Sequence, residues 1–291
     1  MITNQNSKTI LNGKEVANIL CNKLKEKVEL LVKSNKRIPG LSVVIVGENP
    51  ASIAYVKNKE KRANGIGFHT EVHRLNEDVT EDKVISTIEY LNSQNNIDGI
   101  LVQLPLPPHL NTERIINSIS PNKDVDGLHP NNMGKLACGQ KGLVPCTPKG
   151  IIEILHHYNF TTKGKNAVVI GRSNLVGKPI SLLLLQEDAT VTIVHSKTLD
   201  IKHFTKQADI LICAIGKPLF IKKEHVKEES IIIDVGINKI ADGETYKLVG
   251  DVDFNDVLPI CKAITPVPGG IGQMTVAMLM KNTFQAYENI N

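Results

Sequence analysis

The sequence predicts an α/β fold with two α/β domains, each built around a parallel sheet. Short apolar, β-branched runs alternate with segments of helical periodicity, as in parallel strands joined by crossover helices. The alternation stops over residues 121–147, in "PNKDVDGLHPNNMGKLACGQKGLVPCT", and then starts again. A loop of this length is functional or a linker rather than a routine connector. Since 291 residues suffice for two domains with proper cores, we expect a domain boundary near residue 147.

The first half predicts three helices and three strands. Apolar residues at helical spacing between Val16 and Leu31 mark the first helix, and "LSVVIVG" follows as a buried parallel strand that ends at Gly47. The next elements are a helix around Tyr55, a weaker strand over 68–75, a helix that begins near Thr80 and the strand "IDGILVQLP".

The second half repeats this rhythm. Thr147 and Pro148 fit an N-cap followed by proline at the first helical position. "NAVVIGRSNLVGKP" predicts a strand, a turn and a helix, and further strands follow in "TVTIVHS", "ADILICAIG" and "SIIIDVGIN". A loop rich in proline and glycine, "AITPVPGGIGQ", leads into a final helix.

The overall composition is that of a globular protein and argues against a nucleic-acid partner. The chain is 41% hydrophobic and 22% charged, with a net charge of only +4. Its Lys and Arg residues are scattered, aromatic residues make up 4% and Trp is absent, so the basic stripe with stacking aromatics that nucleic acid needs is missing.

Cysteine usage and apolar runs indicate the cellular setting. Five cysteines give an odd number without a C-x-x-C pair, which favours buried thiols in a reducing compartment over disulfides or a metal site. The start "MITNQNSKTI" has no secretion signal, and no apolar run approaches the 18 residues of a membrane span. We therefore expect a soluble cytoplasmic protein that does not bind membranes.

The segment "VVIGRSNLVG" comes close to the dinucleotide fingerprint G-x-G-x-x-G. Gly171 fits the first position, Ser173 replaces the second glycine, and Gly177 lies near the third. A near-match alone is weak, but a buried strand precedes it and a helix follows, whose N-terminus attracts phosphate. The alternative is an ordinary strand-to-helix turn that uses glycine for backbone freedom.

The residues after the next strand favour NADP over NAD. An NAD site usually places Asp or Glu there for the ribose 2′-hydroxyl. This chain instead has His195, Ser196 and Lys197, and Arg172 lies in the first turn. Arg172, Ser173 and Ser196 together suit a 2′-phosphate. The strand ends at 214–216 and 236–238 would form the rim near the nicotinamide, although their glycines could equally serve the turns.

Tyr55 and Lys59 lie one helical turn apart. At about 100° per residue, Lys59 shares a stripe with Val56, Ala63 and Ile66, and not the solvated face of the other lysines. A buried lysine must be paired or lower its pKa, and a lysine with a lowered pKa can exchange protons near neutral pH. The alternative is a lysine that extends along an apolar stripe toward water. Short-chain dehydrogenases also carry Y-x-x-x-K, but there the glycine turn comes first, whereas here the order is reversed.

Long motifs in register along nearly the whole chain resemble the bifunctional methylenetetrahydrofolate dehydrogenase/methenyltetrahydrofolate cyclohydrolase family. They are "VGENPASIAYVKNKEKRANGIG", "DGILVQLPLP", "KDVDGLHP", "GKLACG", "PCTPKG", "VVIGRSNLVGKP", "VTIVHSKT", "DVGIN", "VGDVDF" and "TPVPGGIGQMT". The resemblance implies two α/β domains flanking a cleft, in a homodimer. Residues 1–147 and 273–291 would form a catalytic folate-binding domain, and residues 148–272 a Rossmann-like NADP-binding domain.

The resemblance also assigns site residues. It implies that Lys59, Tyr55, Gln103 and Asp126 are catalytic, with Tyr55 over the folate and Asp126 on its pterin ring. The NADP contacts it implies are Gly171, Arg172, Ser173, Ser196 and Ile237. Pro268, Gly269 and Gly270 would border the folate. Taken singly, Gln103 could serve loop backbone at a strand end, and Asp126 could simply form the turn in "VDG".

The activity implied is oxidation of 5,10-methylenetetrahydrofolate with NADP and hydrolysis of the methenyl product, within one-carbon metabolism that feeds purine and amino-acid biosynthesis. The alternatives are a dehydrogenase-only folate enzyme, a two-domain dehydrogenase of the amino-acid type and a non-catalytic nucleotide-binding module. One departure is Gln273, where the family commonly has proline. We expect a small effect on stability and intact chemistry.

Overall fold

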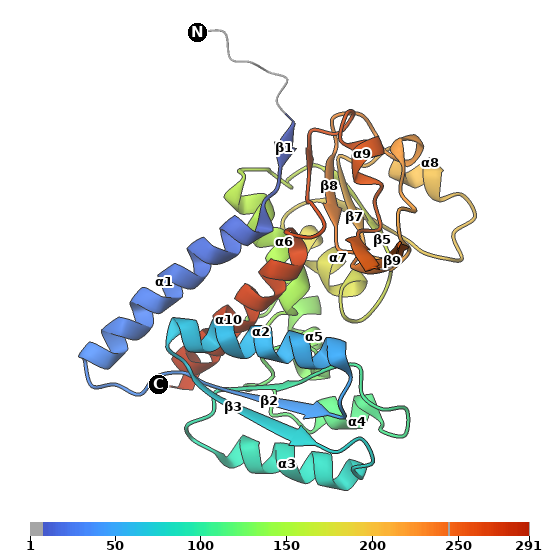
Figure 1. The fold of residues 1–291 in the computed structure, drawn as a ribbon. Coiled ribbons are helices and arrows are strands. Elements are labelled where there is room, and N and C mark those ends of the chain that lie inside the picture. Colours follow the sequence, from blue (N-terminus) through green and yellow to red (C-terminus); the bar gives the residue numbers. More distant parts are fainter. Residues whose placement is uncertain (1–7, 244, 291) are drawn as a thin grey trace. The chain divides into compact units, whose positions relative to one another are not determined.

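The computed structural model describes residues 8–243 and 245–290, and within them the chain divides into two compact α/β units. One unit runs from Thr147 to Thr275 and includes the described residues before Asn18. The other runs from Asn18 to Cys146 and includes the described residues after Thr275. The ribbon shows strands and helices alternating in both units, so the predicted fold class of two α/β domains is confirmed (Figure 1).

The unit that runs from Asn18 to Cys146, called here the three-stranded unit, has a parallel sheet in the order β3-β2-β4. The strands are β2 (Gly40–Val46), β3 (His69–Leu75) and β4 (Gly99–Val102). Every residue of β2 is buried, as the apolar run predicts, whereas β3 is an edge strand with no buried residue, which explains its weak sequence signal. The helices associated with this unit are α2 (Pro50–Ile66), α3 (Glu81–Ser93), α4 (Thr112–Asn117), α5 (Pro130–Ala137) and most of α1 (Gly13–Lys33) and α10 (Ile271–Ile290).

Local sequence signals fix both ends of α2, the helix that carries Tyr55 and Lys59. The side chain of Asn49 accepts hydrogen bonds from the first backbone N–H groups, and Pro50 occupies the first turn. At the other end Gly67 adopts a left-handed conformation with φ of 96°, which glycine allows at no steric cost. These caps set the bounds of the helix at Pro50 and Ile66.

The second unit, called here the six-stranded unit, has a parallel sheet in the order β1-β11-β8-β7-β5-β6. Its strands are β1 (Thr9–Ile10), β5 (Asn166–Ile170), β6 (Thr190–Val194), β7 (Ile210–Cys213), β8 (Ile231–Asp234) and β11 (Ala263–Ile264). After β5 the chain adds β6 on one side and then returns to add β7 on the other. This reversal places a ligand-binding crevice at the carboxyl ends of β5 and β7, as in Rossmann-like folds.

The remaining elements of the six-stranded unit cover the sheet or project from it. An antiparallel hairpin of β9 (Asn238–Asp242) and β10 (Thr245–Val249) forms a separate, largely exposed ribbon. The helices are α6 (Cys146–His157), α7 (Gly177–Gln186), α8 (Ile201–Thr205), the 3₁₀ helix η1 (Lys223–His225) and α9 (Phe254–Val257). Helix α6 begins at Cys146, slightly before the predicted cap at Thr147, a difference within the usual uncertainty of helix ends.

The N-terminal segment differs from the expected domain boundaries. The sequence predicts it in the first domain, but β1 pairs with β11, and Leu11 N donates to Ile264 O at 2.8 Å, which adds the segment to the six-stranded sheet. A strand of two residues is too short to show a hydrophobic period. Residues 1–7 and 291 of the predicted first domain, and residue 244 of the predicted second, lie outside the described residues. No helix of the described chain is long and apolar enough to cross a membrane.

Candidate functional site

The buried face of α2 coincides with the stripe that the sequence predicts. Ser52, Val56, Ala63 and Ile66 are buried. Lys59 lies on the same face but is only partly buried, and Tyr55, one turn earlier, is 46% exposed. Lys59 therefore lies along the apolar stripe, and Tyr55 offers an open aromatic face to a ligand.

The amine of Lys59 has a defined partner at the end of β4. Lys59 Nζ donates to Gln103 Oε1 at 2.9 Å. Gln103 is itself held in place, because its Nε2 donates to Leu104 O at 2.6 Å and its backbone N–H donates to Val44 O at 2.8 Å. The amide thus presents its oxygen to the lysine. The reading of Gln103 as an amide that only serves loop backbone accounts for one of its side-chain contacts, but not for the bond to Lys59.

The electrostatics around Lys59 favour proton exchange. Burial lowers the pKa of Lys59, while Asp126 and Cys146 act in the opposite direction. Burial raises the pKa of Asp126, against the opposing effect of Lys59, and Asp124 raises it further. An amine and a carboxyl whose pKa values are displaced toward each other change protonation at a lower cost than the same groups in water.

A neighbouring carboxylate and a glycine build the loop that carries Asp126. Asp124 accepts hydrogen bonds from Leu128 N, His129 N and Asn132 Nδ2. Gly127 has φ of 73°, and a Cβ there would lie 2.5 Å from Pro145 N. The turn therefore requires glycine at this position. The turn-forming side chain is Asp124, so this loop does not need Asp126 for the same purpose.

Sequence reasoning missed a further residue that holds this loop. Asn282 Nδ2, on α10, donates to Val125 O and to Val144 O, both at 2.8 Å. The side chain is fully buried, and it joins the segment before Asp126 to the segment before Cys146. The sequence signal that could have marked it is a polar residue at helical spacing from the apolar positions Met278, Leu279 and Ala286 of α10.

The six-stranded unit has a pocket of about 260 Å³ at the carboxyl ends of β5, β6 and β7. Four of the five predicted NADP contacts line it, namely Gly171, Arg172, Ser173 and Ser196. The fifth, Ile237, is 47% exposed and is not among the lining residues. The other lining residues are Ile170, His195, Ile201, Ala214, Ile215, Lys217 and Phe220.

Two positions of the near-fingerprint require glycine for steric reasons. Gly171 has φ of 123°, and a Cβ there would lie 2.3 Å from Ala214 O. A Cβ at Gly177 would lie 2.3 Å from Gly171 O. Ser173, in the place of the second glycine, accepts hydrogen bonds through Oγ from Val176 N and Gly177 N at 3.1 and 3.3 Å. The hydroxyl thereby closes the turn before α7.

The residues of this pocket fit NADP. Arg172 and Lys217 bring positive charge, His195 and Ser196 follow β6, and no Asp or Glu is present among the described lining residues. Position 171 tolerates no side chain, which leaves the backbone open to the close approach of a pyrophosphate. Lys217, a cation that sequence reasoning missed, lies over the Phe220 ring at 5.3 Å from its centroid.

Two buried carboxylates hold the loops behind this pocket. Asp251 Oδ2 accepts from Ile215 N at 2.7 Å and from Gly216 N at 3.0 Å, and its Oδ1 accepts from Asn238 Nδ2 at 2.9 Å. Asp234 accepts from the backbone N–H groups of residues 236, 251 and 252, all at 2.9 Å. Burial raises the pKa of Asp234 to about 6 despite these donors. We call Asp234 and Asp251 the carboxylate clamp.

The predicted folate-bordering residues Pro268, Gly269 and Gly270 belong to the six-stranded unit. Gly269 has φ of 107°, and its carbonyl accepts from Lys14 N at 3.0 Å. A Cβ at Gly270 would lie 2.5 Å from Pro266 O, so the loop is tight and needs glycine there. The role of these three residues in binding folate stays a prediction.

The chain combines a Rossmann-like unit that has a basic nucleotide pocket with an α/β unit that carries a half-buried lysine. This combination defines an NAD(P)-linked enzyme of two α/β units. Within that class the chain belongs to the tetrahydrofolate dehydrogenase/cyclohydrolase family. Residues 11–126 match the catalytic domain of the family and residues 145–291 match its NAD(P)-binding domain. The resemblance stated from the sequence is therefore confirmed.

Individual relatives match over most of their length. A bifunctional protein FolD from Chlamydia muridarum is 53% identical over 88% of this chain and 92% of the relative. The crystal structure of the bifunctional FolD dehydrogenase/cyclohydrolase from Campylobacter jejuni superposes with a TM-score of 0.95 at 44% identity, covering 98% of this chain and 100% of the other. The Trypanosoma brucei enzyme, complexed with NADP cofactor and inhibitor, gives 0.94 at 37% identity over 98% of this chain and 99% of the other.

Proposed function

We propose that this protein oxidises 5,10-methylenetetrahydrofolate with NADP⁺ and then hydrolyses the methenyl product. In the first step, 5,10-methylenetetrahydrofolate and NADP⁺ give 5,10-methenyltetrahydrofolate, a cation, and NADPH. In the second, water adds to that cation, a carbon–nitrogen bond opens, and 10-formyltetrahydrofolate and a proton are released. Membership in the family supports both steps, and the contact between Lys59 and Gln103 is the observation that carries the hydrolytic one.

The pocket of the six-stranded unit would hold the cofactor. Arg172 and Ser196 are proposed to bind the 2′-phosphate, and the backbone at Gly171 to approach the pyrophosphate at the start of α7. Ser173 keeps this turn closed, and Ile237 is proposed to contact the nicotinamide part. NADP, when bound, supplies a hydride acceptor. The protein then has to position the substrate carbon beside it, because a hydride leaving a carbon between two nitrogens needs little acid–base help.

Lys59 is proposed to handle the protons of the hydrolysis. Its lowered pKa lets the neutral amine take a proton from the attacking water and return it to the leaving nitrogen. Gln103 fixes the direction of the amine through its 2.9 Å contact. Tyr55 is proposed to pack against the folate, and Asp126, whose raised pKa allows it to donate as well as accept, to bind the pterin ring.

The bifunctional activity is favoured over a dehydrogenase without hydrolysis. Hydride transfer alone requires positioning, so it gives no reason to keep an amine with a lowered pKa next to a fixed amide. Loss of that pair would be the expected sign of a dehydrogenase-only enzyme, and here the pair is present.

Absorbance measurements with purified protein test the proposal. NADPH should form from methylenetetrahydrofolate with NADP⁺, and added methenyltetrahydrofolate should disappear faster with protein than without it. NADPH formation without accelerated hydrolysis would show that the protein is a dehydrogenase without cyclohydrolase activity. Activity on amino acids with neither folate reaction would support the amino-acid type instead.

The assembly and the cellular setting are also part of the proposal. A homodimer follows from the family resemblance, and sedimentation of the purified chain tests it. A cytoplasmic location agrees with five cysteines that form no disulfide in the structure, and fractionation of the source cells tests it. A contribution to purine and amino-acid biosynthesis follows from the proposed formyl product, and a requirement for purines after loss of the gene tests it.

A further inference from the structure

The side-chain amide of Asn282 joins α10 to two separate segments of the three-stranded unit. Its Nδ2 group donates to Val125 O and to Val144 O, both at 2.8 Å, and lies 3.6 Å from Cys146 Sγ. An amide nitrogen carries two hydrogens, so the two carbonyls use both of them. Val125 directly precedes Asp126, and Val144 lies two residues before Cys146. One side chain therefore fixes the backbone beside both Asp126 and Cys146.

The surroundings of this amide leave little room for another arrangement. Asn282 and Val125 are both fully buried. At the start of β4, a Cβ on Gly99 would lie 2.7 Å from Val125 Cγ1 and 3.1 Å from Thr283 Oγ1, so the strand, the loop and α10 approach each other closely here. Because β4 leads to Gln103, the loop is fixed relative to the strand that carries the amide partner of the lysine.

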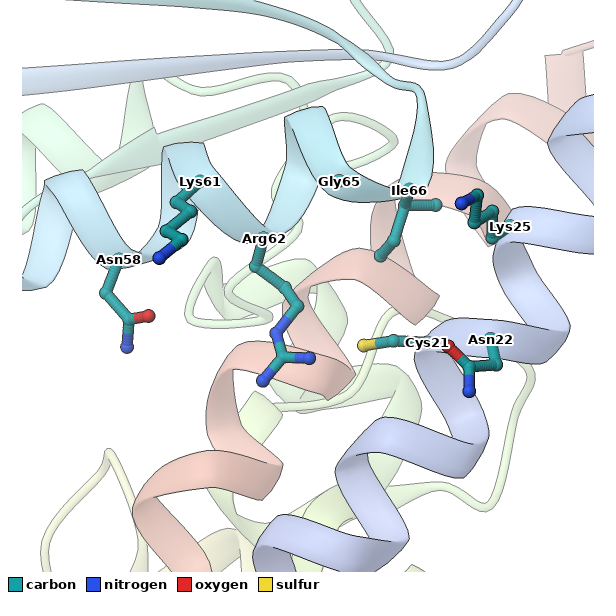
Figure 2. Close-up of a pocket in the computed structure, with 8 residues that line it drawn as sticks. All are labelled: Cys21, Asn22, Lys25, Asn58, Lys61, Arg62, Gly65 and Ile66. Atoms are coloured by element: carbon teal, nitrogen blue, oxygen red, sulfur yellow. The ribbon is translucent and has the colours of Figure 1, made fainter.

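A pocket of about 340 Å³ in the same unit is separate from this contact. It lies between α1 and α2, and Figure 2 shows that its lining side chains belong to these two helices. None of the lining residues lies on α10, in the loop that carries Asp126 or next to Cys146. A change at Asn282 therefore leaves this lining intact, and its effect on a substrate can be traced to the Asp126 loop.

The two side chains beside these carbonyls act on Lys59. Burial lowers the pKa of Lys59, and Asp126 and Cys146 act in the opposite direction. Burial raises the pKa of Asp126, Lys59 opposes that effect, and Asp124 raises it further. Gln103, which accepts the hydrogen bond from the amine, is a neutral amide. Because charge interactions weaken with distance, their strength depends on where the backbone holds the carboxyl and the thiol.

We propose that Asn282 is a positioning residue for the hydrolysis, which acts on Lys59 through Asp126 and Cys146. The inference rests on the proposed function, because that function gives Lys59 a proton to move and Asp126 a pterin ring to bind. Asn282 takes no part in the chemistry, and its two donors keep the carboxyl and the thiol at fixed distances from the amine. An amide with a purely structural role would instead stabilise the unit without changing the reaction.

The variant Asn282→Leu tests the role because it removes both donors at similar volume. KM for methylenetetrahydrofolate should rise about tenfold, and kcat for methenyl hydrolysis should fall by about 10- to 100-fold, since misplacement by about 1 Å has effects of this size. The affinity for NADP⁺ should change by less than about twofold, because the nucleotide pocket belongs to the other unit. Asn282→Ser can donate to one carbonyl only and should give intermediate values.

The pH profile separates positioning from stability. The neutral amine of Lys59 accepts the proton, so the rate of hydrolysis rises with pH through the pKa of this lysine. Asp126 raises that pKa, and its displacement in Asn282→Leu should move the rising limb to lower pH by about 0.5 unit or more. The rates are compared after subtraction of hydrolysis without protein. A limb that keeps its natural midpoint overturns the proposal.

Arg37→Leu is the matched control for lost stability. Arg37 donates to the buried carboxylate of Asp98 at 2.7 and 2.8 Å, just before β4 and thus at the opposite end of this strand from Gln103. Its guanidinium also lies over the Tyr287 ring of α10. Loss of this pair should lower the calorimetric midpoint by a comparable amount but keep the natural KM and pH profile. Equal changes of KM and profile in both variants would assign Asn282 a structural role and overturn the proposal.

Alkylation of Cys146 supplies a readout that does not require folate. The thiol is 2% exposed, so iodoacetamide should modify it slowly in the natural protein well below the unfolding midpoint. Peptide mass spectrometry should show modification at least about tenfold faster in Asn282→Leu, while Cys213, buried in the other unit, stays slow. An unchanged rate at Cys146 overturns the proposal. Absence of turnover with any folate in the natural protein would instead contradict the proposed function, and alkylation would still decide whether Asn282 holds this segment.

Discussion

The two units differ in how many hydrogen bonds hold their buried charged groups. Lys59 in the three-stranded unit makes one hydrogen bond, to a side-chain amide, and its pKa is lowered by burial. The carboxylate clamp in the six-stranded unit accepts six hydrogen bonds, five of them from backbone N–H groups. A charge with few partners can take part in chemistry, whereas a charge saturated by backbone donors fixes loops. The comparison predicts that changes at the two places affect different measurements.

The largest effect is expected from Lys59→Met. Methionine keeps most of the length and apolar contact of the stem but removes the amine, so hydrolysis of methenyltetrahydrofolate should fall by about 10³-fold or more. The apolar packing of the stem is kept, so the variant should still fold, and NADP⁺ binding reports whether it does. The measurement is the rate of loss of methenyl absorbance together with NADP⁺ binding by calorimetry. Near-normal hydrolysis would contradict the assignment, and loss of NADP⁺ binding would mean that the change is not local.

The second effect concerns stability and pH at the carboxylate clamp. The pKa of Asp234 is about 6 in the folded protein and about 3.9 when unfolded, so the folded state binds the proton more tightly. Between about pH 4 and pH 6 this group therefore makes the protein less stable as pH rises, by about 3 kcal/mol in total. Asp251 and Cys213 face Asp234, but Cys213 stays protonated because its pKa is raised well above its usual value.

The variant Asp234→Asn isolates this contribution. It cannot titrate, so the difference in midpoint between natural protein and variant should shrink by roughly 6–12 °C from about pH 4 to about pH 6.5 in calorimetry. The lower stability of the variant at all pH values follows from the loss of one acceptor for backbone donors. A difference that does not vary with pH would show that Asp234 is ionised throughout, and the clamp would then hold its loops without any contribution from the proton.

The sequence predicts the buried face of α2 better than it predicts the carboxylate clamp, and the reason is physical. The face of α2 follows from a period of 3.6 residues, and this local pattern alone places Lys59 beside Val56 and Ala63. Asp234 and Asp251 lie 17 residues apart at strand and loop ends, and no period links them. The family resemblance covers the motifs that contain them, but their hydrogen bonds to the loops behind the nucleotide pocket depend on the tertiary fold.

The same reasoning explains the N-terminal segment and the nucleotide pocket. β1 joins the six-stranded sheet through a partner more than 250 residues away, which local patterns do not indicate. The glycine turn at Gly171 is predictable from residue type because a steric requirement is local in sequence. Lys217 is not predictable in this way, because a single lysine after a strand resembles any surface lysine until the pocket brings it near Arg172.

A third, smaller effect separates the cofactors. Arg172 is exposed and lines the nucleotide pocket. The variant Arg172→Ala should therefore weaken the binding of NADP⁺ by about 10- to 100-fold, because it loses a charged hydrogen bond to the 2′-phosphate. The affinity for NAD⁺, which lacks that phosphate, should change by less than about threefold. Kinetics with both cofactors provide the measurement. Equal losses would refute the 2′-phosphate role, and Lys197→Ala, a change at a neighbouring exposed cation outside the pocket lining, serves as the control.

The smallest effect is expected at Gln273, in the first turn of α10. Proline there would preset φ and reduce the freedom of the unfolded chain, which stabilises by about 0.4–1 kcal/mol where the backbone permits it. It would also remove the bond from Gln273 N to Gly270 O, but at 3.3 Å this bond is long. Gln273→Pro should therefore raise the calorimetric midpoint by about 1–2 °C and leave both activities unchanged. Gln273→Ala keeps the N–H and should not raise it, so a lower midpoint for the proline variant alone would mean that this hydrogen bond outweighs the preset φ.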